Sequence, residues 1–152
     1  MKKQYAVIAL MLFCLFPVSS FAAEKDAAGC KDHPLIPRMP DYYIAGCSSA
    51  PAVAEMEIIR GEATESIHFE GRKSFALSYM PQPEAKTKPS EDQLRENFEN
   101  AIKKMNGTLF GITYGQKWPV YTIPKDGKTF WIILLINPGQ YFDGSYACRI
   151  IE

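Results

Sequence analysis

The stretch Ser90–Gly107 reads SEDQLRENFENAIKKMNG and contains the clearest periodic pattern in the chain. Ser90, with Gln93 three positions later, forms a capping box, the usual start of a helix. The acidic residues that follow Ser90 favour the positive end of the helix dipole, and Asn106-Gly107 is a typical helix end. Apolar residues recur on one face, at Leu94, Phe98, Ala101, Ile102 and Met105. The pattern predicts an amphipathic helix over about residues 90–105, which needs a flat apolar surface to pack on.

Segments on both sides of this helix have the patterns of β-strands. Before it, residues 53–59 alternate apolar and acidic side chains, and residues 66–79 alternate again around Gly71. A glycine within a strand often marks a bulge, which favours one long bent strand over a hairpin in 66–79. A polar linker follows at 81–90. After the helix, strands are predicted at 108–114, 119–123, 129–136 and 146–151.

The turns between the later strands indicate the class of fold. Asp126-Gly127, between two strand patterns, is a strong hairpin signal. Strands joined by hairpins pair antiparallel and leave one face for a helix to cover. The sequence therefore predicts an α+β fold with a mostly antiparallel sheet and one helix packed on one face.

Residues 1–23 have the layout of a secretory signal peptide. Lys2 and Lys3 precede an apolar run over residues 5–16, and small residues follow it. That run is about 12 residues long, shorter than the ~20 residues that a bilayer needs, so cleavage is favoured over a membrane anchor. We therefore predict a periplasmic or secreted protein with no membrane span after cleavage. Residues 24–152 are expected to form a single domain with a proline-rich arm over residues 24–47.

The composition excludes several classes of protein. The chain has 17 basic and 17 acidic residues, and loss of Lys2 and Lys3 leaves 15 against 17, a net charge of −2. This balance, with no basic stripe, argues against a nucleic-acid partner. The 8 Tyr, 9 Phe and 2 Trp are too many for a disordered chain.

Three cysteines remain once Cys14 leaves with the predicted signal peptide. Cys30 and Cys47 flank the arm, whose prolines favour extended backbone. An oxidising compartment favours a Cys30–Cys47 disulfide, with Cys148 unpaired in the last strand. The alternatives are a bridge from Cys148 to either of the other two, or no bridge. Lipidation of Cys30 is disfavoured because charged residues at 24–26 separate it from the apolar run.

The sequence contains no known catalytic motif for a serine hydrolase, a zinc protease or a nucleotide-binding enzyme. His68 is expected to face solvent from a strand. His33, close to Cys30, raises the possibilities of Cys–His catalysis or of a metal held by Cys30, His33 and Cys47. A disulfide would remove the thiolate that both need, and the spacing is not that of a metal site. We expect no cofactor, no metal and, more readily than an enzyme, a non-catalytic protein.

Two groups of residues are the candidates for binding. In the arm, Asp32 and Arg38 are expected to pair and make a rigid clip, and the charged residues Lys31, Asp32, His33 and Arg38 form an alternative docking edge. In the C-terminal half, Trp118 and Tyr141-Phe142 lie in predicted loops, where aromatic side chains are more often exposed for a partner. These aromatics would suit a glycan or a protein of the cell envelope.

The segment Gly29–Ile44, GCKDHPLIPRMPDYYI, resembles the start of a periplasmic domain of bacterial envelope proteins that precedes an OmpA-like domain. Phe69-Glu70-Gly71-Arg72 and the later Asn97-Phe98-x-x-Ala101 extend the resemblance. Here the domain is expected to stand alone, because the sequence lacks the Asp/Arg pattern that binds diaminopimelate. The resemblance therefore implies an envelope location but carries over no peptidoglycan role.

Taken together, these patterns predict an exported cell-envelope binding module. The alternatives are a small periplasmic hydrolase-like enzyme and an inhibitor that uses the proline-rich arm. A pocket that holds a histidine against a carboxylate would favour the enzyme, a projecting arm would favour the inhibitor, and an exposed aromatic patch would favour the binding module.

Overall fold

The computed structural model describes residues 23–136 and 143–152. The predicted signal peptide therefore lies outside the described residues, apart from Ala23, and so do Tyr141 and Phe142. The described elements follow the chain in the order β1 (Tyr42–Pro51), β2 (Glu55–Arg60), β3 (Ala63–His68), β4 (Lys73–Pro81), α1 (Glu91–Lys104), β5 (Thr108–Thr113), β6 (Pro119–Lys125), β7 (Lys128–Ile136) and β8 (Tyr146–Ile151). The predicted α+β class is confirmed.

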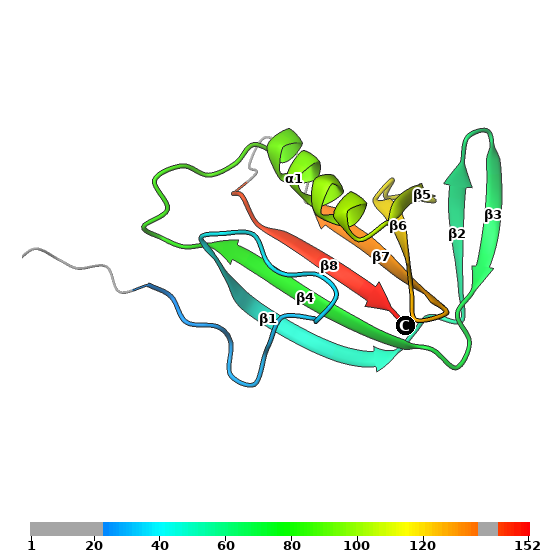
Figure 1. Cartoon of the computed structure of the whole chain (residues 1–152), viewed down its shortest axis with the longest axis horizontal. Helices are drawn as coiled ribbons and strands as arrows, with labels where there is room; N and C mark the ends of the chain where they lie inside the picture. The colour runs from blue at the N-terminus through cyan, green and yellow to red at the C-terminus, as the bar shows by residue number, and fades with distance from the viewer. Residues whose placement is uncertain (1–22, 137–142) are drawn as a thin grey trace, which may run out of the picture.

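The strands form one eight-stranded sheet in the order β1-β4-β8-β7-β6-β5-β2-β3, and every neighbouring pair is antiparallel. After β1 the chain crosses to the far edge, makes the β2–β3 hairpin there, and returns to place β4 beside β1 (Figure 1). Asp126 and Gly127 both have positive φ and close the β6–β7 hairpin, as the Asp-Gly signal predicts.

The predicted long strand over 66–79 is wrong, and so is the hairpin alternative. Residues 63–68 and 73–81 belong to two strands that do not pair, β3 at one edge and β4 beside β1. Arg72 N–H donates to the Phe69 carbonyl at 3.0 Å, and Gly71 has φ 74°, so these residues make a turn. Phe69 is buried and anchors that turn. Alternation of apolar and polar residues shows which face of a sheet each side chain takes, but not which strand is the partner. Because the alternation continues through the turn, it does not reveal where β3 ends and β4 begins.

Helix α1 matches the prediction closely. Ser90 caps it, with Gln93 N–H donating to the Ser90 hydroxyl and the Gln93 side chain accepting from Ser90 N–H. The helix buries Leu94, Phe98 and Ile102 against one face of the sheet. The arm covers the same face and adds Leu35 and Ile36, so that the main core lies beneath helix and arm together.

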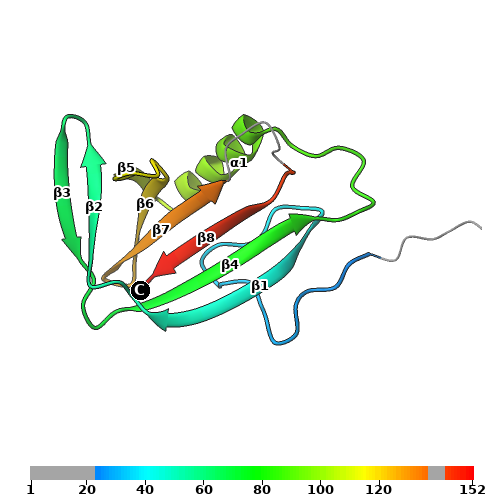
Figure 2. The ribbon, with the colours of Figure 1, turned by 180° about the vertical axis from the view of Figure 1, so that it is seen from behind.

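Among the described residues, no helix lies on the opposite face of the sheet, as the view from behind shows (Figure 2). A second, smaller core lies on that face towards the β2–β3 end and contains Ile58, Phe69, Val120, Ile133 and Ile151. Phe69 and Phe110 both contact Trp131 edge-on there. Within the described residues, the only helix is too short and too polar to cross a bilayer.

Candidate functional site

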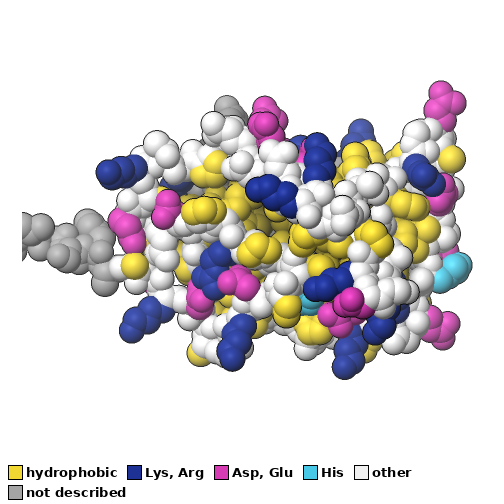
Figure 3. Space-filling model, viewed as in Figure 1, with side chains coloured by type: hydrophobic (Ala, Val, Ile, Leu, Met, Phe, Trp, Pro, Cys, Tyr) yellow, Lys and Arg dark blue, Asp and Glu magenta, His cyan; other side chains and the backbone are white. Residues whose placement is uncertain are grey.

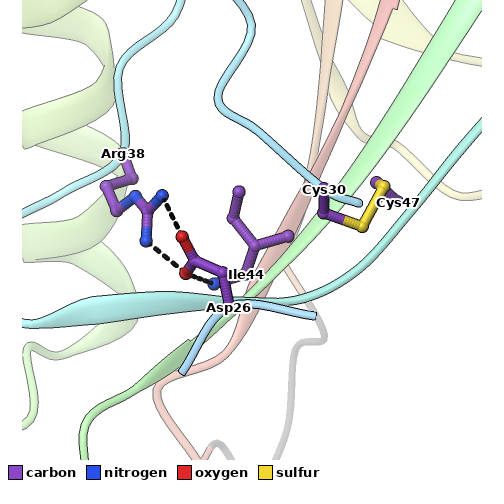
Figure 4. The surroundings of a disulfide bond; sticks show 5 residues. All are labelled: Asp26, Cys30, Arg38, Ile44 and Cys47. Atoms are coloured by element: carbon purple, nitrogen blue, oxygen red, sulfur yellow. Dashed lines mark hydrogen bonds and ion pairs between the residues drawn. A yellow bond between two sulfur atoms is a disulfide. The ribbon is translucent and has the colours of Figure 1, made fainter. Parts of the chain in front are cut away.

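The arm is fastened to β1 by a disulfide between Cys30 and Cys47, which confirms the predicted bridge (Figure 4). Cys148 is a free, buried thiol on β8, also as predicted. Burial raises the pKa of Cys148 to about 12, with a smaller contribution from the nearby Asp32 carboxylate. Since the thiolate is the reactive form, this cysteine is not a nucleophile at neutral pH.

Arg38 holds the two ends of the arm together. Its two terminal nitrogens donate to both carboxylate oxygens of Asp26, at 2.5 and 2.7 Å, and Nε donates to Asp32 at 2.8 Å. Ile44 N–H of β1 donates to the same Asp26 carboxylate at 2.9 Å (Figure 4). The Arg38 guanidinium and that amide lower the pKa of Asp26 below its usual value. The predicted Asp32–Arg38 pair is confirmed, and Asp26, which the sequence analysis missed, is its third member.

Asp32 connects this cluster to the core. Tyr79 O–H of β4 donates to Asp32 at 3.2 Å, and the Tyr79 ring stacks on Tyr146 of β8 at 4.8 Å between centroids. Met39 N–H of the arm donates to the Tyr146 hydroxyl at 3.2 Å. Burial raises the pKa of both tyrosines well above the usual value, so both hydroxyls stay protonated at physiological pH. The charges of Asp26, Asp32 and Arg38 are therefore paired within the protein, which gives these three residues a structural role.

His33 is also occupied by contacts within the protein. Its Nδ1 accepts from Leu35 N–H at 3.2 Å, which leaves Nε2 to donate to Glu152 at 3.1 Å. The ring also packs against Phe75 at 5.3 Å between centroids. A general base needs a free nitrogen that can reach a substrate, and His33 has both nitrogens engaged. The pair thus orients the arm and the end of β8.

The two remaining candidates from the sequence, Lys31 and His68, are both exposed. Lys31 is exposed and borders, with Asp32 and His33, a hollow of about 500 Å³. His68 is exposed at the end of β3, as predicted. Among residues 23–136 and 143–152, no group of three or more histidine, cysteine and carboxylate side chains is placed to bind a metal.

A groove of about 590 Å³ lies on the uncovered face of the sheet, opposite the arm. Its position follows from strand register: Leu77, Tyr79 and Cys148 point to the helix side, so the alternate positions on β4, β8 and β7 point into the groove. The described lining on this face comprises Ala45, Ser78, Met80, Gln116, Trp118, Leu135, Asp143, Ser145 and Ala147. Tyr79, Ile136 and Tyr146 also border the groove, although their side chains belong to the core on the helix side.

Trp118 reaches this groove from the turn between β5 and β6. Two hydrogen bonds to Thr113 fix the backbone of Trp118. Thr113 N–H donates to the Trp118 carbonyl at 2.8 Å, and the Thr113 hydroxyl accepts from Trp118 N–H at 3.1 Å. Lys117 and Gly115 take positive φ within the turn, which reverses the chain tightly. The Trp118 side chain packs against the smaller core and remains half-buried, and the residue lines the groove.

The described lining residues of the groove carry one charge. Asp143 is its only described carboxylate, and no lysine, arginine or histidine is among the described lining residues. Ser145 hydrogen-bonds the Asp143 carboxylate and lowers its pKa, so Asp143 is ionised at neutral pH. The groove is thus apolar along the sheet, with one negative charge at its rim.

A smaller hollow of about 320 Å³ lies on the other face, between α1 and the arm. Apolar side chains gather there, in the middle of the face in Figure 3. Pro37, Met39 and Pro40 line it from the arm, and Phe98 and Ala101 line it from α1. Among its described lining residues the one charged side chain is Arg38, whose guanidinium is bound to Asp26 and Asp32. This hollow is the boundary where the arm packs against α1.

The structure thus separates the predicted binding residues. Asp32, His33 and Arg38 belong to the arm on the helix side of the sheet, and Trp118 lies on the opposite face of the sheet. The groove residues missed by the sequence analysis include Ser78, Met80, Leu135 and Asp143. Strand alternation could have found Ser78 and Met80, since they occupy the phase opposite Leu77 and Tyr79.

Comparison with protein-family models, curated proteins and solved structures finds no match to this chain.

Proposed function

We propose that this chain is an exported cell-envelope binding module without catalytic activity, and that it binds its ligand in the groove beside Trp118. The groove is the observation that carries the proposal. It combines an accessible aromatic residue, an apolar floor and a few polar groups, which is the usual make-up of a binding site.

Export is supported by two features. Residues 1–23 have the order of a basic start, an apolar run and small residues that signal peptidases recognise. The Cys30–Cys47 disulfide suits an oxidising compartment such as the periplasm. The resemblance of Gly29–Ile44 to periplasmic domains that precede OmpA-like domains points to the same location.

The other two functions receive less support from the site. For an enzyme, His33 does border a hollow and lies 3.1 Å from the Glu152 carboxylate, the arrangement that would favour this function. It would nevertheless have to release one of its two hydrogen bonds before it could act on a substrate. For an inhibitor, the arm would have to project, yet Leu35 and Ile36 are buried in the main core.

Cross-linking to native envelope tests the proposal. The mature protein, its Trp118→Ala variant and its Tyr114→Ala variant are each incubated with intact envelope, cross-linked and recovered. Tyr114 is the matched control, because it is an aromatic residue 60% exposed but outside the groove. We expect a defined cross-linked species with the wild type and the Tyr114 variant, and its loss with the Trp118 variant. Equal capture by all three proteins would contradict the groove as the binding site. Export is tested separately on the full 152-residue chain expressed in cells, where an unprocessed N-terminus by mass spectrometry would contradict it.

A further inference from the structure

We propose that the groove beside Trp118 binds an uncharged saccharide of one or two rings. This inference rests on the proposed function and names the chemical class of its ligand.

The shape of the groove suits a flat ligand. Ala45, Ser78 and Ala147 have small side chains and belong to three adjacent strands, β1, β4 and β8, so the sheet floor is shallow there. Trp118 and Leu135 provide bulk on one side of it. A sugar ring has an apolar face of C–H groups that packs against such surfaces and against an indole. The volume of about 590 Å³ lies within the range of roughly 300–1000 Å³ for small-molecule sites.

Polar groups are distributed around this apolar centre. Ser78 and Ser145 contribute hydroxyls, Gln116 contributes an amide, and Asp143 contributes a carboxylate. Hydroxyls and amides both donate and accept hydrogen bonds, and a carboxylate accepts strongly. A saccharide carries hydroxyls around its edge that can hydrogen-bond to Ser78, to Gln116 and to the lone pairs of Asp143 that Ser145 does not use. A purely apolar ligand would remove water from these groups without replacing its hydrogen bonds, at a cost.

The charge decides against anionic ligands. Asp143 is the only charged side chain among the described lining residues, and Lys88, whose charge also lowers the pKa of Asp143, is not one of them. An acidic ligand would therefore lose hydration without gaining an ion pair and would be repelled by Asp143. A neutral sugar avoids both costs.

The test is titration calorimetry of the mature protein with three disaccharides: chitobiose and maltose as neutral probes and digalacturonate as an anionic probe. We expect at least one neutral disaccharide to bind, with a dissociation constant of about 1 mM or below, and digalacturonate to bind at least about tenfold more weakly. Trp118→Ala should weaken binding about tenfold or more, which corresponds to about 1.4 kcal/mol. Tyr114→Ala should leave binding within about twofold, because Tyr114 lies outside the groove.

Ser78→Phe provides a second variant in case loss of Trp118 perturbs the fold. Ser78 is exposed on β4, and an aromatic residue suits a strand, so this change fills the groove without entering the core. It too should weaken saccharide binding about tenfold while Trp118 stays in place.

Absence of neutral disaccharide binding at ~20 mM would overturn the proposal. So would equal affinity for digalacturonate, or binding that Trp118→Ala and Ser78→Phe both leave unchanged. If envelope cross-linking still depends on Trp118 while no saccharide binds, the saccharide inference fails and the binding module stands. If cross-linking is also independent of Trp118, both fail.

Discussion

At the residue scale, Arg38 is the side chain that joins two separate parts of the arm. It contacts two carboxylates from separate parts of the arm and is only 26% exposed. Partial burial limits screening by water, and the paired oxygens of Asp26 match the fork of a guanidinium. Its contribution should therefore exceed that of an ordinary surface ion pair.

We predict that Arg38→Met lowers the free energy of unfolding by about 1–2 kcal/mol, because two partly buried carboxylates lose their partner. Arg95→Met is the matched control, since Arg95 pairs with Glu91 one helical turn away and lies at the surface. The control should cost about 0.5 kcal/mol or less. Urea unfolding followed by fluorescence measures both, and equal losses would contradict a special role for Arg38.

Cys148 leads to a prediction about reactivity at the same scale. In the native mature protein at pH 8, we expect no thiol to react with a disulfide reagent, because burial both shields Cys148 and raises its pKa to about 12. Denaturation without reductant should expose one thiol, and denaturation with reductant should expose three. Rapid labelling of the native protein would contradict the burial, and three thiols without reductant would contradict the disulfide.

At the scale of elements, the β2–β3 hairpin is the least integrated part of the sheet. Only two residue pairs, Ile58 with Thr113 and Ile59 with Ile112, define its ladder with β5. Gly111 lies at the irregularity in the β5–β6 pairing, where the backbone of β2 approaches closely. A β-carbon there would sit 2.4 Å from the Ile59 carbonyl oxygen and 2.8 Å from a methyl of Ile58.

We predict that Gly111→Ala loosens this hairpin, because a backbone oxygen cannot move aside without breaking the β2–β5 ladder. Amide exchange should rise in residues 55–68 and change little in β4, β7 and β8. Gly46→Ala is the control, since Gly46 also lies at a strand irregularity but has open space around its added β-carbon. Unchanged exchange in Gly111→Ala would contradict the prediction, because it would show that the hairpin accommodates the added methyl group without loosening.

At the scale of the whole molecule, the disulfide and the Arg38 cluster hold an arm that completes the main core. Leu35 and Ile36 are 5% and 2% exposed, so the arm belongs to the packed interior beneath α1. Losing the bridge frees the arm in the unfolded chain and removes a loop constraint.

We predict that the double change Cys30→Ser with Cys47→Ser lowers the free energy of unfolding by about 3 kcal/mol, since the bridge closes a loop of some 16 residues. The sheet should persist, because most of the core lies between α1 and the strands. Circular dichroism and urea unfolding measure the two effects. Cys148→Ala serves as the control for a cysteine outside the bridge, because it removes the buried thiol without placing a hydroxyl in the core. A fully unfolded double variant would contradict a sheet that persists without the bridge.

The elements that could be predicted from the sequence are those that local chemistry controls. The capping box at Ser90, the apolar stripe of α1 and the Asp-Gly turn before Lys128 each depend on residues close together in the chain, so they were predicted with nearly correct bounds. The Cys30–Cys47 bridge and the Asp32–Arg38 pair were also predictable, because the arm brings close sequence neighbours together.

The pairing of the strands and the position of the groove could not be predicted from the sequence and are known only from the tertiary structure. Alternation ran without a break through Phe69 to Gly71, yet β3 and β4 lie at different positions in the sheet, because pairing depends on long-range packing that no local pattern records. In the same way, Trp118 is a loop residue in the sequence, and Ser78 and Ala147 are unremarkable small residues. They become one surface because antiparallel register turns alternate side chains of β4, β8 and β7 to the face that no helix covers.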